Sequence, residues 1–177
     1  MLYLRENKEK TVSFSGYRPH KFDFSISGGR ESDKFAVRLF DEIIKAIEND
    51  YNTFISGMAP GFDIIAAELV ILAKRAYPEK EIKLICTLPF GDFKYSKHFD
   101  QHWRGRYDSV IDHCNKIINV TNSTIETIYC YSSRNKFMVD NCSQLICYHT
   151  GKSGGTESTI QYAESSGVEI VNIATLI

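Results

Sequence analysis

Short apolar runs alternate along the chain with longer stretches in which apolar residues recur every three or four positions. Six of these runs are rich in β-branched and aromatic residues and end at glycine, proline or polar turn residues, which is the pattern of buried strands. The spacing of three and four between the runs predicts helices that bury one face. The predicted strands are residues 11–15, 53–56, 82–87, 116–120, 144–148 and 169–173.

The first and third of the predicted helices carry clear apolar stripes, which indicate helices that pack on a core. The first stripe consists of Phe35, Leu39, Phe40, Ile43, Ile44 and Ile47, and the other of Phe99, Trp103, Tyr107 and Val110. Helices are predicted to begin near Ser32 or Asp33, to cover 64–77, to begin at about Ser96, to carry 134–139 and to follow Thr156.

Strands therefore alternate with helices from one end of the chain to the other. This order predicts an α/β fold of three layers, in which a mostly parallel sheet has helices on both faces and right-handed crossovers. The ligand crevice of such a sheet lies at the carboxyl ends of its strands. At 177 residues we expect one domain, with residues 1–10 as a polar lead-in.

Composition and charge limit the kinds of partner that the protein is expected to bind. The chain is 43% hydrophobic and 24% charged, which is near the average of soluble globular proteins, and its net charge is −1. The balanced charge argues against a nucleic-acid surface built on phosphate neutralisation, although it allows a local basic pocket. The lead-in is too charged for a signal sequence and no apolar run approaches a membrane span, so we expect a cytoplasmic protein without a membrane partner.

Five cysteines show no C-x-x-C pair and no metal spacing. Three of them, Cys86, Cys130 and Cys147, lie in or beside apolar stretches. We therefore interpret the cysteines as reduced core residues, which agrees with a cytoplasmic setting.

The segment 145–159, LICYHTGKSGGTEST, is the strongest candidate for chemistry. It is predicted to be a strand, a loop with Gly151, Gly154 and Gly155, and a helix, and a helix that starts at such a loop presents unpaired amides to an anion. The alternative is a tight strand-to-helix connection with no ligand. The spacing fits neither the P-loop, which would need a glycine at the position of Ile146, nor the dinucleotide fingerprint.

In a parallel sheet the ends of the other strands lie on the same edge as this loop. Several of these strand ends are small, hydroxylated or rich in glycine, and together they favour a phosphate-and-sugar site over plain turns. The candidate ligand-binding residues are Ser15, Gly16, Tyr17, Arg18, Ser56, Gly57, Gly61, Asp63, Pro89, Phe90, Arg134, Asn135, Gly151, Ser153, Gly154, Gly155 and Thr156.

The side chains of this set suggest separate roles. Arg18 offers a guanidinium fork for a phosphate, and Arg134 does so if its helix begins near the same edge; otherwise each is a surface charge. Asp63 either accepts a ribose hydroxyl or complements the start of its helix. Phe90 and Tyr17 are candidates to stack on a base, against the alternative of packing at the edge of the core.

A metal site has little support. His98 and His102 are four residues apart on a predicted helix, which is a spacing that lets two imidazoles share a metal, with Asp100 and Asp112 as conceivable partners. No third ligand has motif spacing, and no nucleophile motif occurs. We therefore expect neither a metal nor a resident cofactor.

Four motifs in order carry a resemblance to a known family. They are 15–19 (SGYRP), 56–63 (SGMAPGFD), Arg134-Asn135 with 138–140 (MVD), and 151–156 (GKSGGT). Over residues 11–173 the chain resembles the YpsA/YspA-type proteins of the SLOG superfamily, which is named after the DNA-processing protein DprA and the LOG enzymes. The resemblance implies a Rossmann-like fold, a glycine loop that binds nucleotides or nucleotide-derived ligands, and a bacterial or phage origin.

The resemblance does not carry over an activity. LOG enzymes are phosphoribohydrolases whose motif P-G-G-x-G-T-x-x-E ends in a catalytic glutamate. Gly155-Thr156 matches this motif, but Thr159 stands where the glutamate would be, and a hydroxyl cannot act as a carboxylate base. Glu157 lies on a different face of the helix. DprA-like binding of single-stranded DNA is disfavoured by the balanced charge and the lack of a basic stripe.

The leading hypothesis is a binding module for a nucleotide or nucleotide-sugar phosphate, acting as a sensor that reports to a partner protein. The first alternative is an N-glycosidase that acts on nucleoside monophosphates and uses Asp63 or Glu157. The second is a protein-interaction module with a vestigial pocket. A homo-oligomer is open as well, because the apolar helix 64–76 suits either a core or an interface.

Overall fold

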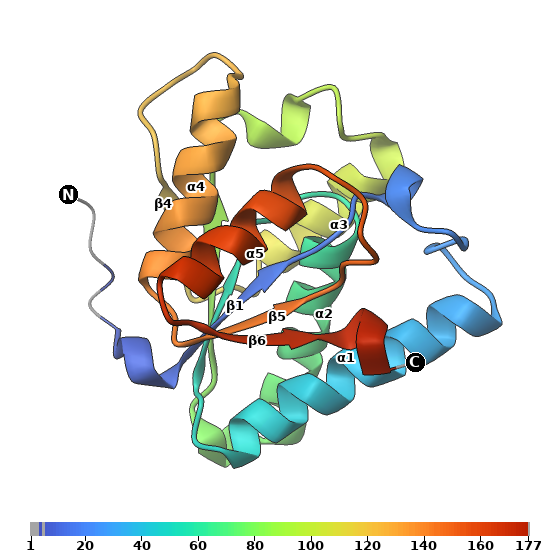
Figure 1. Ribbon diagram of the computed structural model, residues 1–177, viewed down its shortest axis with the longest axis vertical. Helices are drawn as coiled ribbons and strands as arrows, with labels where there is room; N and C mark the ends of the chain where they lie inside the picture. Colours follow the sequence, from blue (N-terminus) through green and yellow to red (C-terminus); the bar gives the residue numbers. More distant parts are fainter. Residues whose placement is uncertain (1–3, 5, 177) are drawn as a thin grey trace.

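The run TVSFS at the start of the chain becomes the central strand of a parallel sheet. The computed structural model describes Leu4 and residues 6–176, and these residues form six strands in the order β4-β3-β2-β1-β5-β6, with every neighbouring pair parallel (Figure 1). The α/β prediction is confirmed. The strands are β1 (Thr11–Ser15), β2 (Thr53–Ser56), β3 (Lys83–Leu88), β4 (Lys116–Asn119), β5 (Gln144–Cys147) and β6 (Glu169–Asn172).

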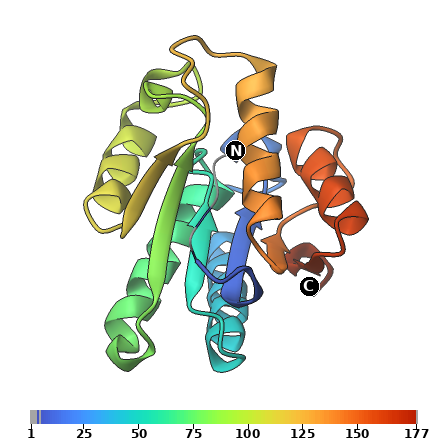
Figure 2. The same cartoon turned by 90° about the vertical axis from the view of Figure 1, so that its left-hand side faces the viewer.

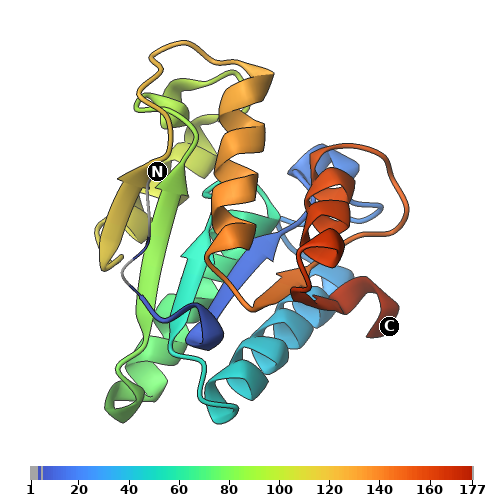
Figure 3. The ribbon, with the colours of Figure 1, turned by 60° about the vertical axis from the view of Figure 1, so that its left-hand side comes forward.

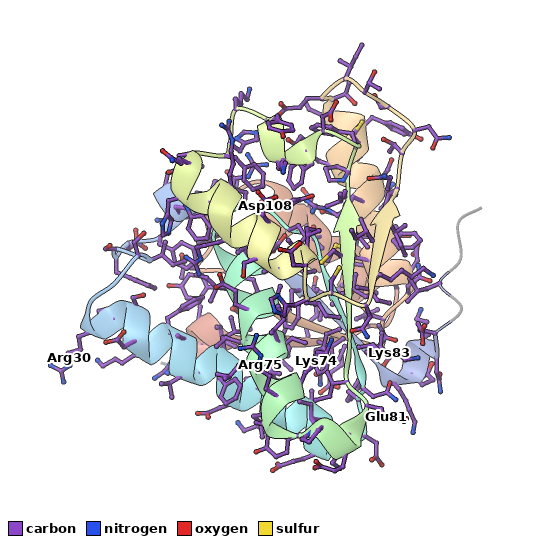
Figure 4. The ribbon with its side chains drawn as sticks, turned by 180° about the vertical axis from the view of Figure 1, so that it is seen from behind. Arg30, Lys74, Arg75, Glu81, Lys83 and Asp108 are labelled. Atoms are coloured by element: carbon purple, nitrogen blue, oxygen red, sulfur yellow. The ribbon has the colours of Figure 1, made fainter. Side chains whose placement is uncertain are left out.

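Helices cover both faces of the sheet, so the predicted three layers are present. Helices α4 and α5 lie side by side on one face, whereas α1, α2 and α3 cover the other (Figures 2 and 4). Within the described residues no helix is both long and apolar enough to cross a membrane. The helices are α1 (Arg30–Glu48), α2 (Phe62–Ala76), α3 (Gln101–Ile111), α4 (Ile128–Asp140) and α5 (Gly155–Ser165).

Short 3₁₀ turns complete the connections between these elements. They are η1 (Lys8–Lys10), η2 (Pro19–Lys21), η3 (Pro78–Lys80), η4 (Phe93–Tyr95) and η5 (Ile173–Leu176). Within the predicted lead-in, Leu4 is buried and its amide donates to Asn141 Oδ1 at 3.2 Å, while residues 1–3 and 5 lie outside the described part of the chain.

The predicted start of α3 at Ser96 is wrong by five residues. The turn η4 precedes Ser96, and α3 begins only after Asp100, whose side chain accepts the amide hydrogen of Trp103 at 2.9 Å. Both Ser96 and Asp100 suit a helix start by residue type, but Asp100 makes the capping bond. Phe99 therefore packs in the core from the loop, ahead of the helix.

The order in which strands are added to the sheet reverses between β1 and β5, although all the strands are parallel. From β1 the chain adds β2, β3 and β4 on one side, and it then crosses to place β5 and β6 on the other side. At such a switch point the connections after the two strands diverge and leave a crevice outside the carboxyl ends. Both faces of β1 are buried, which fixes the position of this crevice relative to the core.

Candidate functional site

A pocket of about 310 Å³ lies at the carboxyl end of β1, at this switch point. Its wall comes from four parts of the chain: the end of β1 with η2, the start of α2, the face of α4, and the first turn of α5. In Figure 3 the arrow of β1 ends beside α5. The lining residues are Phe14, Ser15, Gly16, Tyr17, Arg18, His20, Lys21, Ala59, Asp63, Tyr131, Arg134, Asn135, Gly155 and Thr156.

The structure brings only part of the predicted site to this pocket. Among the candidate residues, those in the wall are Ser15, Gly16, Tyr17, Arg18, Asp63, Arg134, Asn135, Gly155 and Thr156. Those outside the wall are Ser56, Gly57, Gly61, Pro89, Phe90, Gly151, Ser153 and Gly154.

Arg18 faces the pocket from the end of β1. Among the described residues its guanidinium forms no salt bridge, and its central carbon lies 5.4 Å from the centre of the Tyr131 ring. A planar guanidinium held over an aromatic ring keeps its edge free for a bidentate anion. Arg18 is therefore the best placed cation for a phosphate group.

A buried ion pair forms the floor of the pocket. Arg134 is 4% exposed and Asp63 6% exposed, and Arg134 Nη1 lies 3.9 Å from Asp63 Oδ2. Arg134 Nη1 also donates to the Gly57 carbonyl, and Nε donates to Asn135 Oδ1 at 2.8 Å. Its Nη2 makes no hydrogen bond among the described residues, so one donor of this buried cation remains for a ligand.

Burial sets the protonation of the pair. It raises the pKa of Asp63 to about 6, against the opposing effects of the Arg134 charge and of the Ala59 amide, which donates to Asp63 Oδ2 at 3.4 Å. Burial also lowers the pKa of Arg134, while the Asp63 charge raises it. A carboxyl group with this pKa in a pocket wall is suited to exchange a proton near neutral pH.

Two of the predicted ligand-binding glycines instead make room for the protein itself. A Cβ at Gly57 would lie 2.2 Å from Arg134 Nη1 and 2.7 Å from Asp63 Oδ2. A Cβ at Gly61, where φ is +98°, would lie 2.5 Å from the Tyr17 carbonyl oxygen. These glycines therefore support the ion pair and the turn beneath the pocket.

Ser56 and Pro89 are likewise engaged within the protein. Ser56 Oγ donates to the Asp63 carbonyl at 2.8 Å and accepts the Met58 amide hydrogen at 3.1 Å. The Pro89 carbonyl accepts a hydrogen bond from Thr121 Oγ1 at 2.6 Å. Ser56, the last residue of β2, and Pro89, which follows β3, thus form hydrogen bonds within the protein at the ends of these strands.

The two aromatic rings expected to stack on a base are packed in the core instead. The Tyr17 side chain is 1% exposed, and its ring meets Phe22 and Tyr148 edge-on. Phe90 is 3% exposed and packs against Phe93 and Tyr131. The alternative reading of these two residues, packing at the edge of the core, describes their positions.

The Tyr17 hydroxyl organises the glycine loop. It accepts the amide hydrogens of Thr150 at 2.9 Å and of Lys152 at 3.0 Å, so the buried ring carries a fixed acceptor beneath the loop. Lys21 makes a further hydrogen bond to the loop, in which its Nζ donates to the Ser153 carbonyl at 2.8 Å. The loop that leads into α5 is thus held from the segment that follows β1.

The amino end of α5 faces the pocket. Its N-cap is Gly154, whose φ of +140° suits glycine and which supplies no capping side chain. Thr156 Oγ1 donates to the Gly16 carbonyl at 3.0 Å and ties this turn to β1. The first amides of a helix lack intrahelical partners and carry partial positive charge, so the wall at Gly155 and Thr156 favours an anion.

Five lining residues were missed by the sequence reasoning: Phe14, His20, Lys21, Ala59 and Tyr131. Tyr131 lies three residues before Arg134 on α4, and this spacing indicates the same helix face. Nothing in the sequence pattern indicates Lys21, because the path of an irregular loop sets its position.

The residues considered for a metal lie apart from the pocket wall. His98 precedes α3, so the predicted helical pair with His102 is wrong, and His98 Nε2 lies 3.1 Å from Glu126 Oε1. His102 packs edge-on against Trp103. Among the described residues no group of three or more histidine, cysteine, aspartate or glutamate side chains is arranged to hold a metal.

The two residues singled out by the LOG motif lie outside this pocket. Glu157 is in the first turn of α5 but not in the pocket wall. Thr159 is 5% exposed; its hydroxyl donates to the Gly155 carbonyl at 2.7 Å and accepts from Asn135 Nδ2 at 2.9 Å. Thr159 therefore joins α4 to α5.

Comparison with known proteins relates the chain to one family. The model of the YspA SLOG family matches residues 12–175, and no curated protein sequence matches. DNA processing protein A from Helicobacter pylori is 19% identical, with a TM-score of 0.60 over 90% of this chain and 63% of its own. DNA processing protein A from Streptococcus pneumoniae is 13% identical, with a TM-score of 0.49 over 95% of this chain and 60% of its own. The chain thus spans less than two thirds of either protein, and the first likeness shows the fold.

Proposed function

Because the chain belongs to the YspA SLOG family, we propose that the pocket at the end of β1 binds a nucleotide or a nucleotide-derived phosphate ester, and that the domain is a sensor that reports this ligand to a partner protein. The observation that carries the proposal is the convergence of Arg18, Arg134 and the amino end of α5 on one pocket. All three favour a negatively charged guest.

The charge of the wall supports a phosphate rather than a neutral ligand. The wall contains Arg18, Lys21 and Arg134 but only one carboxylate, Asp63, which Arg134 neutralises. Ser15 and Thr156 belong to the same wall, and their hydroxyls suit the oxygens of a sugar phosphate. At about 310 Å³, the pocket is near the lower end of the range for small-molecule sites, roughly 300–1,000 Å³.

A single nucleotide fits this charge distribution better than a strand of nucleic acid. The structure of the Helicobacter pylori protein concerns a single-stranded DNA binding mode. The present chain has a net charge of −1, and binding a polyanion requires an extended basic surface in addition to a local pocket. We therefore expect AMP to bind more tightly than a short oligothymidine at physiological salt.

Thermal unfolding with added ligand tests the proposal. A ligand at about 100 times its dissociation constant should stabilise the folded state by roughly 2.7 kcal/mol. AMP and ribose 5-phosphate should do so for the wild type and fail to do so for Arg18→Gln. The matched control is Arg75→Gln, an exposed arginine in the last turn of α2, at the opposite end of that helix from the pocket (Figure 4). Equal stabilisation of wild type and Arg18→Gln would place the ligand elsewhere.

The position and the pKa of Asp63 support a second candidate function, which is N-glycosidase activity on nucleoside monophosphates. Its carboxyl group is in the pocket wall, and burial raises its pKa to about 6, so it is able to supply or accept a proton near neutral pH. Chromatography of protein incubated with AMP, GMP and CMP would detect released base. Release that Asp63→Asn abolishes supports the hydrolase; binding without release supports the sensor.

A further inference from the structure

A second cavity of about 270 Å³ lies between α4 and α5. We name it the α4–α5 slot. The two helices run side by side on one face of the sheet (Figure 2), and both of them contribute residues to the wall of the slot. Its wall consists of Ile128, Tyr131, Ser132, Asn135, Lys136, Gly155, Ser158, Thr159 and Tyr162.

The slot is continuous with the pocket at the end of β1. Tyr131, Asn135 and Gly155 are in the walls of both cavities. A molecule seated against the first turn of α5 therefore reaches the slot by passing these three shared residues. The usual volume of a ligand site begins at roughly 300 Å³, and each cavity alone is close to this lower limit. The two cavities together offer a volume well within the range.

The two cavities differ in chemistry. The pocket presents three cationic side chains and helix amides. The slot is lined by the rings of Tyr131 and Tyr162, the side chain of Ile128 and a single cation, Lys136, whose Nζ lies 5.5 Å from the centre of the Tyr162 ring. Ile128 is 88% exposed, so a molecule in the slot would cover part of its apolar surface. A polar group would thus be favoured at one end of a bound molecule and a flat apolar group at the other.

The hydroxyl and amide groups of the slot are engaged by the protein. Thr159 and Asn135 hydrogen-bond each other, Ser158 Oγ donates to the Gly154 carbonyl, and the Tyr162 hydroxyl donates to Asp140 Oδ1. Ser132 Oγ donates to the Tyr129 carbonyl at 3.1 Å. These donors are engaged, and Lys136 Nζ lies over the Tyr162 ring. The slot therefore binds its occupant by contact area and stacking more than by hydrogen bonds to the edge of the occupant.

We propose that the α4–α5 slot holds the base of a mononucleotide whose phosphate lies at Arg18 and the amino end of α5. This inference rests on the function proposed above and adds which part of the ligand the slot binds. Every base has a face that stacks on an aromatic side chain, so purine and pyrimidine nucleotides are expected to bind with similar affinity.

Calorimetric titration with AMP and with ribose 5-phosphate separates the two parts of the site. The wild type should bind AMP at least about tenfold more tightly than ribose 5-phosphate, because only AMP occupies the slot. Ser132→Phe places a ring in the slot and should remove this advantage, while its affinity for ribose 5-phosphate stays within about twofold of the wild type. Ser158→Phe fills the slot from α5 and serves if the first variant fails to fold.

Ser165→Phe is the matched control, because Ser165 is an exposed serine on α5 outside the slot wall. Its preference for AMP should equal that of the wild type. Equal binding of AMP and ribose 5-phosphate by the wild type would overturn the slot inference and leave the proposed function standing; binding of neither would overturn both. A change of oligomeric state in Ser132→Phe, seen by ultracentrifugation with AMP affinity unchanged, would assign the slot to a second copy of the chain and overturn the inference.

Discussion

Two consecutive residues at the end of β1 have opposite environments. Tyr17 is 1% exposed and holds the glycine loop through its hydroxyl, whereas Arg18 is half-buried and faces the pocket. The alternation follows from the extended backbone that continues past the strand, in which successive side chains point to opposite sides. One residue thus fixes the shape of the site while its neighbour supplies charge to it.

Removing the Tyr17 hydroxyl should loosen the glycine loop. Tyr17→Phe leaves the amides of Thr150 and Lys152 without their acceptor, and we expect the free energy of unfolding to fall by about 1–3 kcal/mol and AMP binding to weaken. Tyr148→Phe is the control, because the Tyr148 hydroxyl makes no hydrogen bond among the described residues. Urea unfolding and calorimetry measure both effects; a Tyr17→Phe variant as stable as Tyr148→Phe would contradict the role.

The ion pair between Arg134 and Asp63 should be sensitive to loss of either partner. In Arg134→Met the buried Asp63 must either stay charged without its cation or take up a proton, and the Gly57 carbonyl loses its donor. At pH 7 we expect a loss of roughly 3–5 kcal/mol in the free energy of unfolding. Arg134→Met with Asp63→Asn should recover part of this loss, since the uncompensated charge is gone. Chemical unfolding of the two single variants and the double variant gives the coupling energy, and additive losses would show that the pair is not coupled.

At the scale of elements, the alternation of strands and helices could be predicted from the sequence, because each element buries apolar residues that recur with the period of a strand or of a helix. The glycines between β2 and α2 were harder to interpret. A glycine in the sequence indicates that a Cβ is excluded at that position, but it does not show which atoms exclude it. At Gly57 these are atoms of the Arg134 side chain, and at Gly61 the Tyr17 carbonyl oxygen. The contribution of Lys21 depends on a loop path that no periodic pattern describes.

The proposed anion site depends on the amino end of α5. Gly155 begins the helix, and a Cβ built there meets no atom within 4 Å, so Gly155→Ala should leave stability within about 0.5 kcal/mol of the wild type. The added methyl group projects where the ligand is proposed to approach, and AMP binding should weaken at least tenfold. Thermal unfolding with and without AMP measures both quantities.

Gly105 provides a matched control for this substitution. It is exposed within α3, its Cβ also meets no atom within 4 Å, and it is outside the pocket wall. Gly105→Ala should raise the free energy of unfolding by about 0.5–1 kcal/mol, because alanine is the better helix former, and leave AMP binding unchanged. Full AMP affinity in Gly155→Ala would show that the ligand does not lie against α5.

At the scale of the whole molecule, Asp63 links stability to pH. Its pKa in the folded protein, about 6, is above its ordinary value of 3.8, so between these values the folded state binds more protons than the unfolded state. The contribution of Asp63 to stability is therefore full below about pH 4 and falls as pH rises to about 6. At one pKa unit per 1.36 kcal/mol, the fall amounts to roughly 3 kcal/mol.

Urea unfolding of the wild type and of Asp63→Asn between pH 4 and pH 7 isolates this contribution. The free energy of unfolding of the wild type, minus that of the variant, should decrease with rising pH over this interval and level off above it. A difference that increases with pH would mean that the Arg134 charge outweighs burial at this site.

The hydrogen bond from Thr156 to the Gly16 carbonyl joins positions 140 residues apart along the chain. A polypeptide cut in the loop between β4 and α4 would carry Arg18 on one piece and the amides of α5 on the other. Neither piece contains the whole wall of the pocket. Binding of the proposed ligand would then report that the two pieces have reassembled, and the domain would serve as a scaffold for a split reporter.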